Sequence, residues 1–367
     1  MLAFKNKLLG SVFSFSLAGI TIESSSAYCS LNLSVGTSAQ TIYSEKLWFH
    51  NGSVTVYNLN ELIEDYMRDN KIISMLVSLT TTNDAGEHDN IAVNVFYCDS
   101  SEISEVMALD HFNSNFLTTL QSRRISPEYD FSLYLYSQNS EREFYELNIS
   151  YSVQGEETLK SVLSHGYVQD FADQIYAVDL NMAELRRYAA TDARVSASLI
   201  DIKSFSVSCG DRYAVFYVDK TLLLGETFIF RNIFNAIDWV TVPALTNSKI
   251  EVDRSMAVLP GKSAFYDRVV TKNYELQSGP LSFEEAELTE QLAASHEAYK
   301  YEPIGYVNAI KQYAVKEILI TDSDISYSDS DEPQSVKFTW RYAVNRPPIL
   351  LTDPARIFTS EYNKVFS

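Results

Sequence analysis

The chain has 367 residues, with 29 lysines and arginines against 48 aspartates and glutamates, so its formal net charge is −19. A nucleic-acid duplex is bound by neutralising its phosphates with Lys and Arg, and the sequence contains no dense basic patch, so we exclude nucleic acid as a partner. Apolar residues make up 46% of the chain and charged residues 21%, which is too hydrophobic for a disordered protein. The length predicts two or three domains, and the 24 Tyr and 20 Phe favour strands.

The N-terminal segment has two interpretations. Lys5 and Lys7, followed by an apolar stretch and three small residues, imitate a secretory signal peptide. The same stretch alternates apolar and small polar residues, which is the period of a strand. We therefore favour a strand over residues 12–23, and export with removal of residues 1–27 stays the alternative. No run reaches the ~20 apolar residues that a membrane-spanning helix needs, so we predict no membrane insertion.

Residues 1–126 are predicted to form a β-sandwich domain with one short helix. Strands are expected at 28–35, 41–49, 54–57, 72–80 and 91–98. Asn51-Gly52 predicts a tight hairpin, because both central residues of a type I′ turn need positive φ. Asn60 is the expected N-cap of a helix over 60–69, whose apolar face would include Leu62.

Residues 127–244 are predicted to form a second β-sandwich domain. Its expected strands are 131–137, 144–153, 195–208, 213–218 and 227–233. Val95-Phe96-Tyr97 recurs 120 residues later as Val215-Phe216-Tyr217, and the strand and helix around Asn60 recur in looser form around Asn181. Two matches in the same order suggest a tandem duplication. The alternative is that strands rich in Val, Phe and Tyr resemble one another by chance.

Residues 245–367 are predicted to form a β-rich C-terminal domain. Ser282, with Glu285 three residues later, has the pattern of a capping box and predicts a helix over 282–296. A β-hairpin is expected from residues 314–327 and 335–342. The whole chain is therefore predicted to be mainly β, with tandem β-sandwich domains of Ig-like or jelly-roll-like type and a few short helices.

The acidic segment 322–332 at the tip of this hairpin is a candidate Ca²⁺ ligand set. An EF-hand loop needs Gly at its sixth position and a bidentate acid at its twelfth. Counted from Asp322, those positions hold Tyr327 and Pro333. We therefore favour a solvated acidic turn over a Ca²⁺ site.

Residues that carry chemistry are scattered singly. Cys29, Cys98 and Cys209 lie far apart without Cys-x-x-Cys spacing, which predicts small buried thiols rather than a zinc site or a disulfide framework. No phosphate-binding loop, dinucleotide-binding glycine motif, nucleophile elbow or His-Glu-x-x-His sequence occurs. We predict no enzyme, no catalytic, cofactor-binding or metal-binding residues, and no cofactor. A hydrolase with a carboxylate pair stays open, because such a pair is defined by its separation in space.

Four segments together resemble uncharacterised tail-associated structural proteins of phages and prophages of gut Bacteroidetes, and the similarity spans most of the chain. These segments are the opening residues 1–16, Tyr57-Asn58-Leu59-Asn60-Glu61-Leu62-Ile63-Glu64, Ser278-Gly279-Pro280-Leu281-Ser282, and Lys337-Phe338-Thr339-Trp340-Arg341-Tyr342 with Asn345-Arg346-Pro347. The resemblance implies a β-rich virion protein without a cofactor or a signal peptide, assembled in the host cytoplasm. It supplies no functional residues.

Our first functional hypothesis is a structural virion protein of a bacteriophage, a tail or baseplate ring or adaptor component. Its partners would be other virion proteins and copies of itself. The alternative is a secreted or surface bacterial β-sandwich binding protein, an adhesin or a carbohydrate binder. Aromatic side chains mostly pack between sheets, but Tyr is also favoured at contact surfaces, so contact with a host-surface glycan or receptor is part of both hypotheses.

Overall fold

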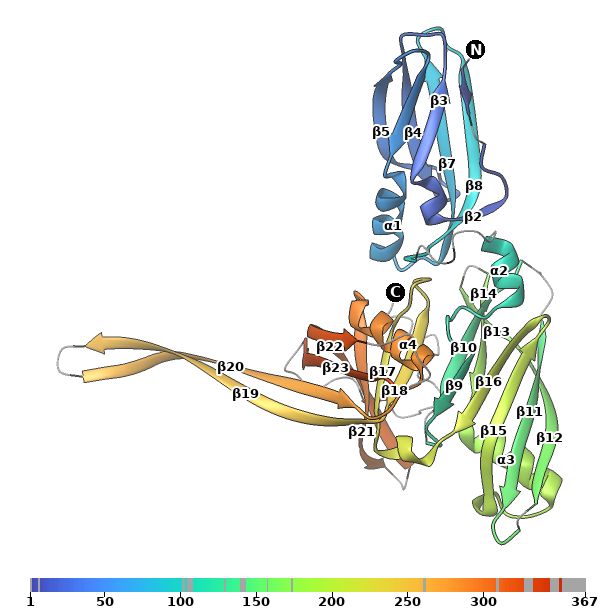
Figure 1. Ribbon diagram of the computed structural model, residues 1–367, viewed down its shortest axis with the longest axis vertical. Helices are drawn as coiled ribbons and strands as arrows, with labels where there is room; N and C mark the ends of the chain where they lie inside the picture. The colour runs from blue at the N-terminus through green and yellow to red at the C-terminus, as the bar shows by residue number, and fades with distance from the viewer. Residues whose placement is uncertain are drawn as a thin grey trace.

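The computed structural model describes residues 2–5, 7–100, 103, 108–128, 130–138, 143–156, 158–172, 174–259, 262–307, 310–326, 333–343 and 350–351. These residues form a mainly-β protein with five sheets and four short α-helices (Figure 1). No helix among them is long and apolar enough to cross a membrane. We call the three groups of strands units 1, 2 and 3.

Unit 1 is a sandwich of a three-stranded sheet, β1-β3-β6, and a five-stranded sheet, β2-β8-β7-β4-β5. The inner faces of the two sheets share one core, in which Ile20 and Val56 of one sheet join Leu31 and Val77 of the other. Its elements are β1 (Ala3–Phe4), β2 (Ser11–Phe13), η1 (Ser14–Leu17), β3 (Gly19–Glu23), β4 (Tyr28–Val35), β5 (Gln40–Trp48), β6 (Ser53–Tyr57), α1 (Leu59–Asp69), β7 (Ser74–Asn83) and β8 (His88–Phe96).

Unit 2 follows a linker that contains helix α2 (Ala108–Ser114). It too pairs a three-stranded sheet, β10-β14-β13, with a five-stranded sheet, β12-β11-β15-β16-β9. Its core includes Phe131 and Val178 of one sheet and Phe205 and Phe216 of the other. Its elements are β9 (Ser122–Ile125), β10 (Phe131–Tyr136), β11 (Phe144–Val153), β12 (Leu159–Tyr167), β13 (Gln169–Ala172), β14 (Ile175–Leu180), α3 (Met182–Ala193), η2 (Ala197–Leu199), β15 (Ile200–Cys209) and β16 (Arg212–Val218).

The two units share the topology of the five-stranded sheet, and β3–β6 corresponds to β10–β14 in the other sheet, whereas the third strand differs: β1 pairs with β3 in unit 1 and β13 pairs with β14 in unit 2. In each five-stranded sheet the strand that comes first in the chain pairs in parallel with the strand that comes last in the chain: β2 with β8, and β9 with β16. The other neighbouring strands are antiparallel. In each unit a helix, α1 or α3, connects the three-stranded sheet back to the five-stranded one. This strand order is that of an Ig-like sandwich, so the chain contains tandem Ig-like units.

The common topology supports a tandem duplication, although the matched residues are not equivalent. Val95 and Val215 do lie in corresponding strands, β8 and β16. Val95 is fully buried in the unit 1 core, whereas Val215 lies on the outer side of its strand, opposite Ser206. Because side chains alternate along a strand, the match is out of register by an odd number of residues.

Unit 3 is one eight-stranded sheet with helix α4 packed against β17, β18, β22 and β23. Its core includes Phe228, Phe338 and Trp340 from the sheet and Leu288 from the helix. Its elements are η3 (Lys220–Leu224), β17 (Glu226–Arg231), β18 (Ile237–Val242), β19 (Ala244–Leu259), β20 (Lys262–Ser278), α4 (Phe283–Ala294), β21 (Ala298–Val307), β22 (Ile310–Ser326), β23 (Ser335–Tyr342) and β24 (Leu350–Leu351). The capping box of Ser282 and Glu285 is present, as predicted.

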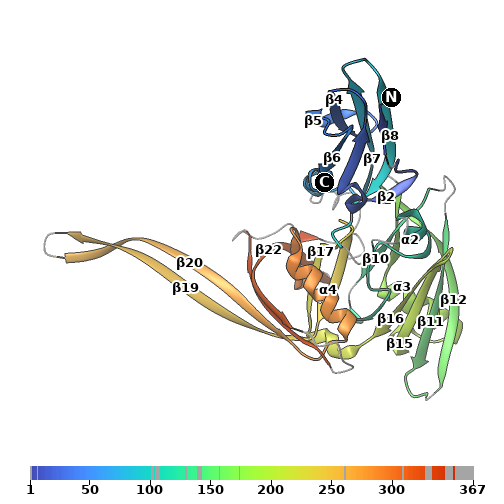
Figure 2. The same ribbon diagram turned by 45° about the horizontal axis from the view of Figure 1, so that its top comes forward.

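A long two-stranded ribbon projects from unit 3 in both views (Figures 1 and 2). Strands β19 and β20 pair with each other from Ala244 and Ser278 out to Leu259 and Lys262. Among the described residues, the sheet pairs with the ribbon only at its base, where residues 274–277 of β20 pair with β23. We call residues 250–272 the arm. At ~3.3 Å per residue it reaches about 30 Å beyond its base.

The prediction of one strand over residues 12–23 is wrong. The chain forms β2, then the 3-10 turn η1, then β3, and the two strands belong to different sheets. Ser14 is fully buried, and its hydroxyl donates to the carbonyl of Cys98 and accepts from the backbone N–H of the same residue. A crossover between the layers of a sandwich needs such a turn, and alternation of small and apolar residues does not reveal it.

The Asn51-Gly52 prediction is confirmed for the turn and wrong for the hairpin. Both residues have positive φ, 49° and 81°. However, β5 pairs with β4 and β6 pairs with β3, so the turn connects two sheets. The paired residues at the turn itself are only His50 and Ser53. Local turn chemistry is the same for both arrangements, so the sequence could not separate them.

Helix α1 begins one residue earlier than expected, and its cap differs. The N-cap residue is Asn58, in the left-handed conformation, and Asn60 lies inside the first turn. The buried positions are Leu59, Ile63 and Met67, whereas Leu62 is 42% exposed. The apolar face is therefore a narrow i, i+4 stripe.

Strand pairing differs from the sequence-based division at residues 126/127 and 244/245. Residues 122–125, which the division assigns to the first domain, form strand β9 and pair with β16 in unit 2. Strands β17 and β18, expected in the second domain, belong to the sheet of unit 3. The predicted β22–β23 hairpin is present, but the acidic residues 327–332 and the segment 344–349 lie outside the described residues.

Candidate functional site

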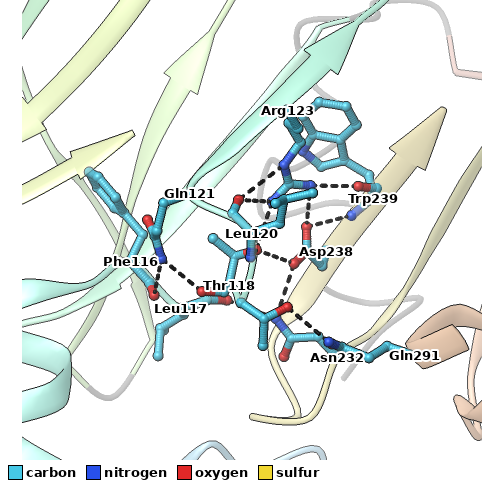
Figure 3. Close-up of polar contacts among 11 residues, drawn as sticks. Phe116, Leu117, Thr118, Leu120, Gln121, Arg123, Asn232, Asp238, Trp239 and Gln291 are labelled. Atoms are coloured by element: carbon cyan, nitrogen blue, oxygen red, sulfur yellow. Dashed lines mark hydrogen bonds and ion pairs between the residues drawn. The ribbon is translucent and has the colours of Figure 1, made fainter. Parts of the chain in front are cut away.

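A buried polar cluster joins units 2 and 3 where β9 meets β18 (Figure 3). The Arg123 guanidinium donates to Asp238 Oδ1 at 2.8 Å and to the Trp239 carbonyl at 2.7 Å, and both side chains of the ion pair are 3% exposed. Thr118 donates to Asp238 Oδ2 and accepts from Arg123, each at 2.6 Å. Asn232 donates to the same Oδ2 and to the Leu117 carbonyl. A buried network so fully paired makes the joint rigid.

The turn between β17 and β18 also reaches unit 1. Asn235 is fully buried and donates from Nδ2 to the carbonyls of Met67 and Ile72, each at 3.0 Å. Beside it, Glu297 accepts from Lys71 of unit 1 at 2.8 Å and from Arg231 at 2.6 Å. The same side chain therefore ties unit 1 to unit 3.

Glu297 has a perturbed pKa. Burial alone would raise it, but hydrogen bonds from Lys71 and Tyr299 and the positive charge of Arg231 outweigh burial, so the pKa is lowered. The carboxylate therefore stays ionised at neutral pH, and its ion pairs persist.

A cleft of about 510 Å³ lies where the units meet. Its lining comes from the end of unit 1, from the linker and from unit 3, and includes Asp99, His111, Glu290 and His296. Burial lowers the pKa of both imidazoles, and for His296 the nearby Arg231 charge adds to this. Both histidines are therefore mainly neutral at physiological pH. The groups mix donors and acceptors, and no three of the described His, Cys, Asp or Glu residues cluster as a metal site would require.

The three cysteines are buried, as predicted. Burial raises the pKa of Cys98 to about 12, and burial together with a hydrogen bond to Glu143 raises that of Cys209 to about 12. Burial also raises the pKa of Cys29. Thiols held protonated in this way are poor nucleophiles. Of the acidic segment, Asp322 and Asp324 lie on β22, opposite Thr339 and Lys337.

The outer face of the unit 1 five-stranded sheet carries an aromatic pair at one corner. Tyr28, the first residue of β4, lies directly opposite Trp48, the last residue of β5. The ring centroids are 5.2 Å apart, and Trp48 is 65% exposed. Tyr and Trp combine an apolar ring with a polar tip and usually find partners at contact surfaces. We call these two residues the corner pair of unit 1.

Unit 2 has a corner pair at the same place. Phe144, the first residue of β11, lies directly opposite Tyr167, the last residue of β12. They are 59% and 68% exposed. In each unit, therefore, two aromatic residues lie opposite each other at the end of the same strand pair at the sheet edge; Trp48, Phe144 and Tyr167 are exposed, and Tyr28 is half-buried. Core packing cannot explain this repetition, because these side chains face solvent.

A strip of polar side chains runs from each corner pair along the outer face; it is uncharged in unit 1 and contains one carboxylate, that of Glu146, in unit 2. In unit 1 it is Ser30, Asn32 and Ser34 of β4 beside Thr82, Thr80 and Ser78 of β7. In unit 2 the same positions hold Glu146, Asn148 and Ser150 of β11 beside Ser208, Ser206 and Ser204 of β15. Hydroxyl and amide groups both donate and accept hydrogen bonds. The strips can therefore bind a ligand rich in hydroxyl groups.

Sequence reasoning predicted no site residues and missed both corner pairs. A signal was present, since Tyr28 and Phe144 each begin an alternating strand whose further outward positions are polar. The sequence could not show which residue lies opposite each of them. Trp48 and Tyr167 take these positions because of the register in which the two strands pair, and that register depends on the connecting turn.

No protein family model and no curated protein matches this chain. Among solved structures, a bacterial ice-binding adhesin involved in host cell surface retention has 11% identity and a TM-score of 0.15, covering 76% of this chain and 92% of its own. A complex of Dpr2 Ig1-Ig2 with DIP-Theta Ig1-Ig3 has 6% identity and a TM-score of 0.20, with 94% and 91% covered. SGBP-B of Bacteroides ovatus, solved with a mixed-linkage heptasaccharide, has 9% identity and a TM-score of 0.16, with 91% and 75% covered. At such TM-scores these structures say nothing about what this chain binds.

Proposed function

We propose that this chain is a non-enzymatic β-sandwich binding protein of the adhesin or carbohydrate-binding class, acting at a bacterial surface. The observation that carries the proposal is the repeated corner pair, Tyr28 with Trp48 and Phe144 with Tyr167. Exposed rings offer flat apolar faces against which the C–H face of a sugar ring can pack. The neighbouring strips supply hydrogen bonds to hydroxyl groups, and the strip of unit 1 does so without the desolvation cost of burying charges.

The test is retention of the full chain on a panel of immobilised polysaccharides: xylan, galactomannan, laminarin and polygalacturonate. The double variant Trp48→Ala/Tyr167→Ala removes the exposed ring of each pair and should lose retention on every polymer that holds the wild type. The matched control is Tyr57→Ala/Tyr213→Ala, which removes rings of 72% and 57% exposure outside the corner pairs. Equal retention of the double variant and the wild type would refute the proposal.

A second candidate is the structural virion protein of a phage tail or baseplate, and the arm favours it. A two-stranded ribbon without a third strand or a packed face is marginally stable alone, so a projecting arm indicates a partner surface. Ile250 and Val252 at its base are 61% and 42% exposed. In this hypothesis the partners are copies of the chain and other virion proteins. Peptides of this chain in purified phage particles, identified by mass spectrometry, would support it, and a chain that stays monomeric and is missing from particles would rule it out.

A further inference from the structure

Lys46 distinguishes the corner pair of unit 1. It lies on β5 two residues before Trp48, so its side chain shares the outer face with that ring. Its ammonium nitrogen is 3.6 Å from the centroid of the Tyr28 ring and 4.9 Å from that of Trp48. Two cation–π contacts therefore hold a positive charge beside the exposed indole. Among the described residues no carboxylate pairs with Lys46, although the chain has a net charge of −19.

The corresponding position in unit 2 is arranged differently. His165 lies two residues before Tyr167, and its Nδ1 is 3.7 Å from Glu146 Oε1. Glu146 stands directly opposite His165, in the place that Ser30 takes opposite Lys46. The carboxylate of Glu146 would pair with any cation at this position and neutralise its charge. The corner pair of unit 1 therefore has a positive charge beside it that no carboxylate neutralises, whereas the corner pair of unit 2 has none.

The chemistry around Lys46 selects among acidic ligands. The strip beside it, from Ser30 to Asn32 and across to Thr80, is uncharged, with Ser44 donating to Asn32 at 2.6 Å. A polyanionic peptide would need several cations along its path, whereas a sugar acid presents one carboxylate per ring together with several hydroxyl groups. One ammonium, one exposed ring and a hydroxyl-rich strip match the second pattern by charge and by hydrogen-bonding groups.

We infer that Tyr28, Lys46 and Trp48 form a binding site for an acidic saccharide, with a pyranose ring on the Trp48 indole and its carboxylate at the Lys46 ammonium. This inference rests on the proposed function. It adds the class of ligand, an acidic saccharide, and the residue that recognises its carboxylate, Lys46. The corner pair of unit 2, where Glu146 faces His165, takes neutral sugars instead.

The test compares two matched polymers, polygalacturonate and its fully methyl-esterified form, by affinity electrophoresis of the full chain at low salt. Wild type should bind the acid about tenfold more tightly than the ester, the range expected for one charge-assisted hydrogen bond. Lys46→Gln should lose this preference and keep the affinity for the ester. The matched control is Lys272→Gln, which removes another exposed lysine that lies 4.8 Å from a tyrosine ring centroid, that of Tyr274. In 1 M salt the preference should vanish, because screening removes the Coulomb attraction.

Four outcomes would overturn the inference. Wild type could bind acid and ester equally; if Trp48→Ala then weakened both, the proposed function would stand and the acid site would fail. Lys46→Gln could keep the preference for the acid. Poly-glutamate could displace the wild type from immobilised polygalacturonate as well as free polygalacturonate does, in which case the site binds acidic peptides. Binding of neither polymer would remove the acidic saccharide as ligand, whereas binding of neutral members of the wider panel would still support the proposed function.

Discussion

At the scale of single residues, the strongest constraints lie in the buried charges at the joints between units. Arg123 and Asp238 are both almost completely buried, and every bond they make in Figure 3 goes to a side chain or backbone group of a residue that is itself buried. The guanidinium also lies 4.8 Å from the Trp239 ring centroid. An ion pair of this kind adds little net stability over a well-packed apolar pair, but losing one partner leaves an unpaired charge in the interior.

Arg123→Ala should therefore destabilise the joint between units 2 and 3 by about 3–5 kcal/mol, since it strands Asp238 without its main donor. Hydrogen exchange of the β18 amides measures this directly. The control is Arg187→Ala, whose ion pair with Glu184 is 66% and 59% exposed and should matter by less than about 0.5 kcal/mol. Equal protection of β18 in the two variants would show that the network has no such role.

Glu297 gives a pH dependence whose sign follows from its lowered pKa. Its ion pairs contribute stability that is fully present above the unfolded-state pKa of about 4.3 and is lost as pH falls through the lower folded-state value. Urea midpoints of wild type and Glu297→Gln should therefore differ at pH 7 and converge below about pH 4. A constant difference down to pH 3 would contradict the ion pairs with Lys71 and Arg231.

At the scale of elements, the chain repeats a topology rather than a sequence. The helices α1 and α3 occupy the same connection, with N-caps at Asn58 and Asn181, yet only the Asn181 side chain bonds the first turn. The strand pairs β4–β5 and β11–β12 both end in a corner pair. The arm has no counterpart in units 1 and 2. Its removal can therefore show whether it is needed for self-association without being needed for folding.

Replacing residues 250–272 by Asn-Gly should leave the fold intact, because the sheet pairs with β20 only over residues 274–277. We expect the unfolding free energy to change by less than about 1 kcal/mol, as the ribbon adds little stability of its own. If the arm binds copies of this chain, the same deletion should abolish self-association in sedimentation velocity experiments. A deletion that unfolds unit 3 would show instead that the arm is part of its core.

Period and local chemistry in the sequence predicted most strands, the β22–β23 hairpin and the α4 capping box. They could not predict where the chain changes sheets. The 3-10 turn after Phe13 and the Asn51-Gly52 turn look locally like a continuous strand and a hairpin, and only packing of the second layer decides otherwise. The corner pairs were hidden for the same reason, because Tyr28 and Trp48 meet through strand register.

At the scale of the whole molecule, the joints hold the three units as one body. Aromatic rings add to the polar joints: Phe13 of unit 1 packs on Phe112 of the linker helix, which packs on Phe234 of unit 3. In both views β5 lies in the upper part of the molecule and β12 lies lower down at its right side (Figures 1 and 2). A rigid body with a corner pair near each of these strands is suited to bridging two ligand chains.

Ligand binding at the corner pairs can be tested directly through Trp48. Of the three tryptophans, Trp48 is 65% exposed, whereas Trp239 and Trp340 are 5% and 2% exposed. Acrylamide should therefore quench mainly Trp48, and Trp48→Phe should remove the quenchable emission. Saturating polygalacturonate should protect this emission from acrylamide in the wild type. Binding of the polymer with unchanged quenching of Trp48 would contradict the account.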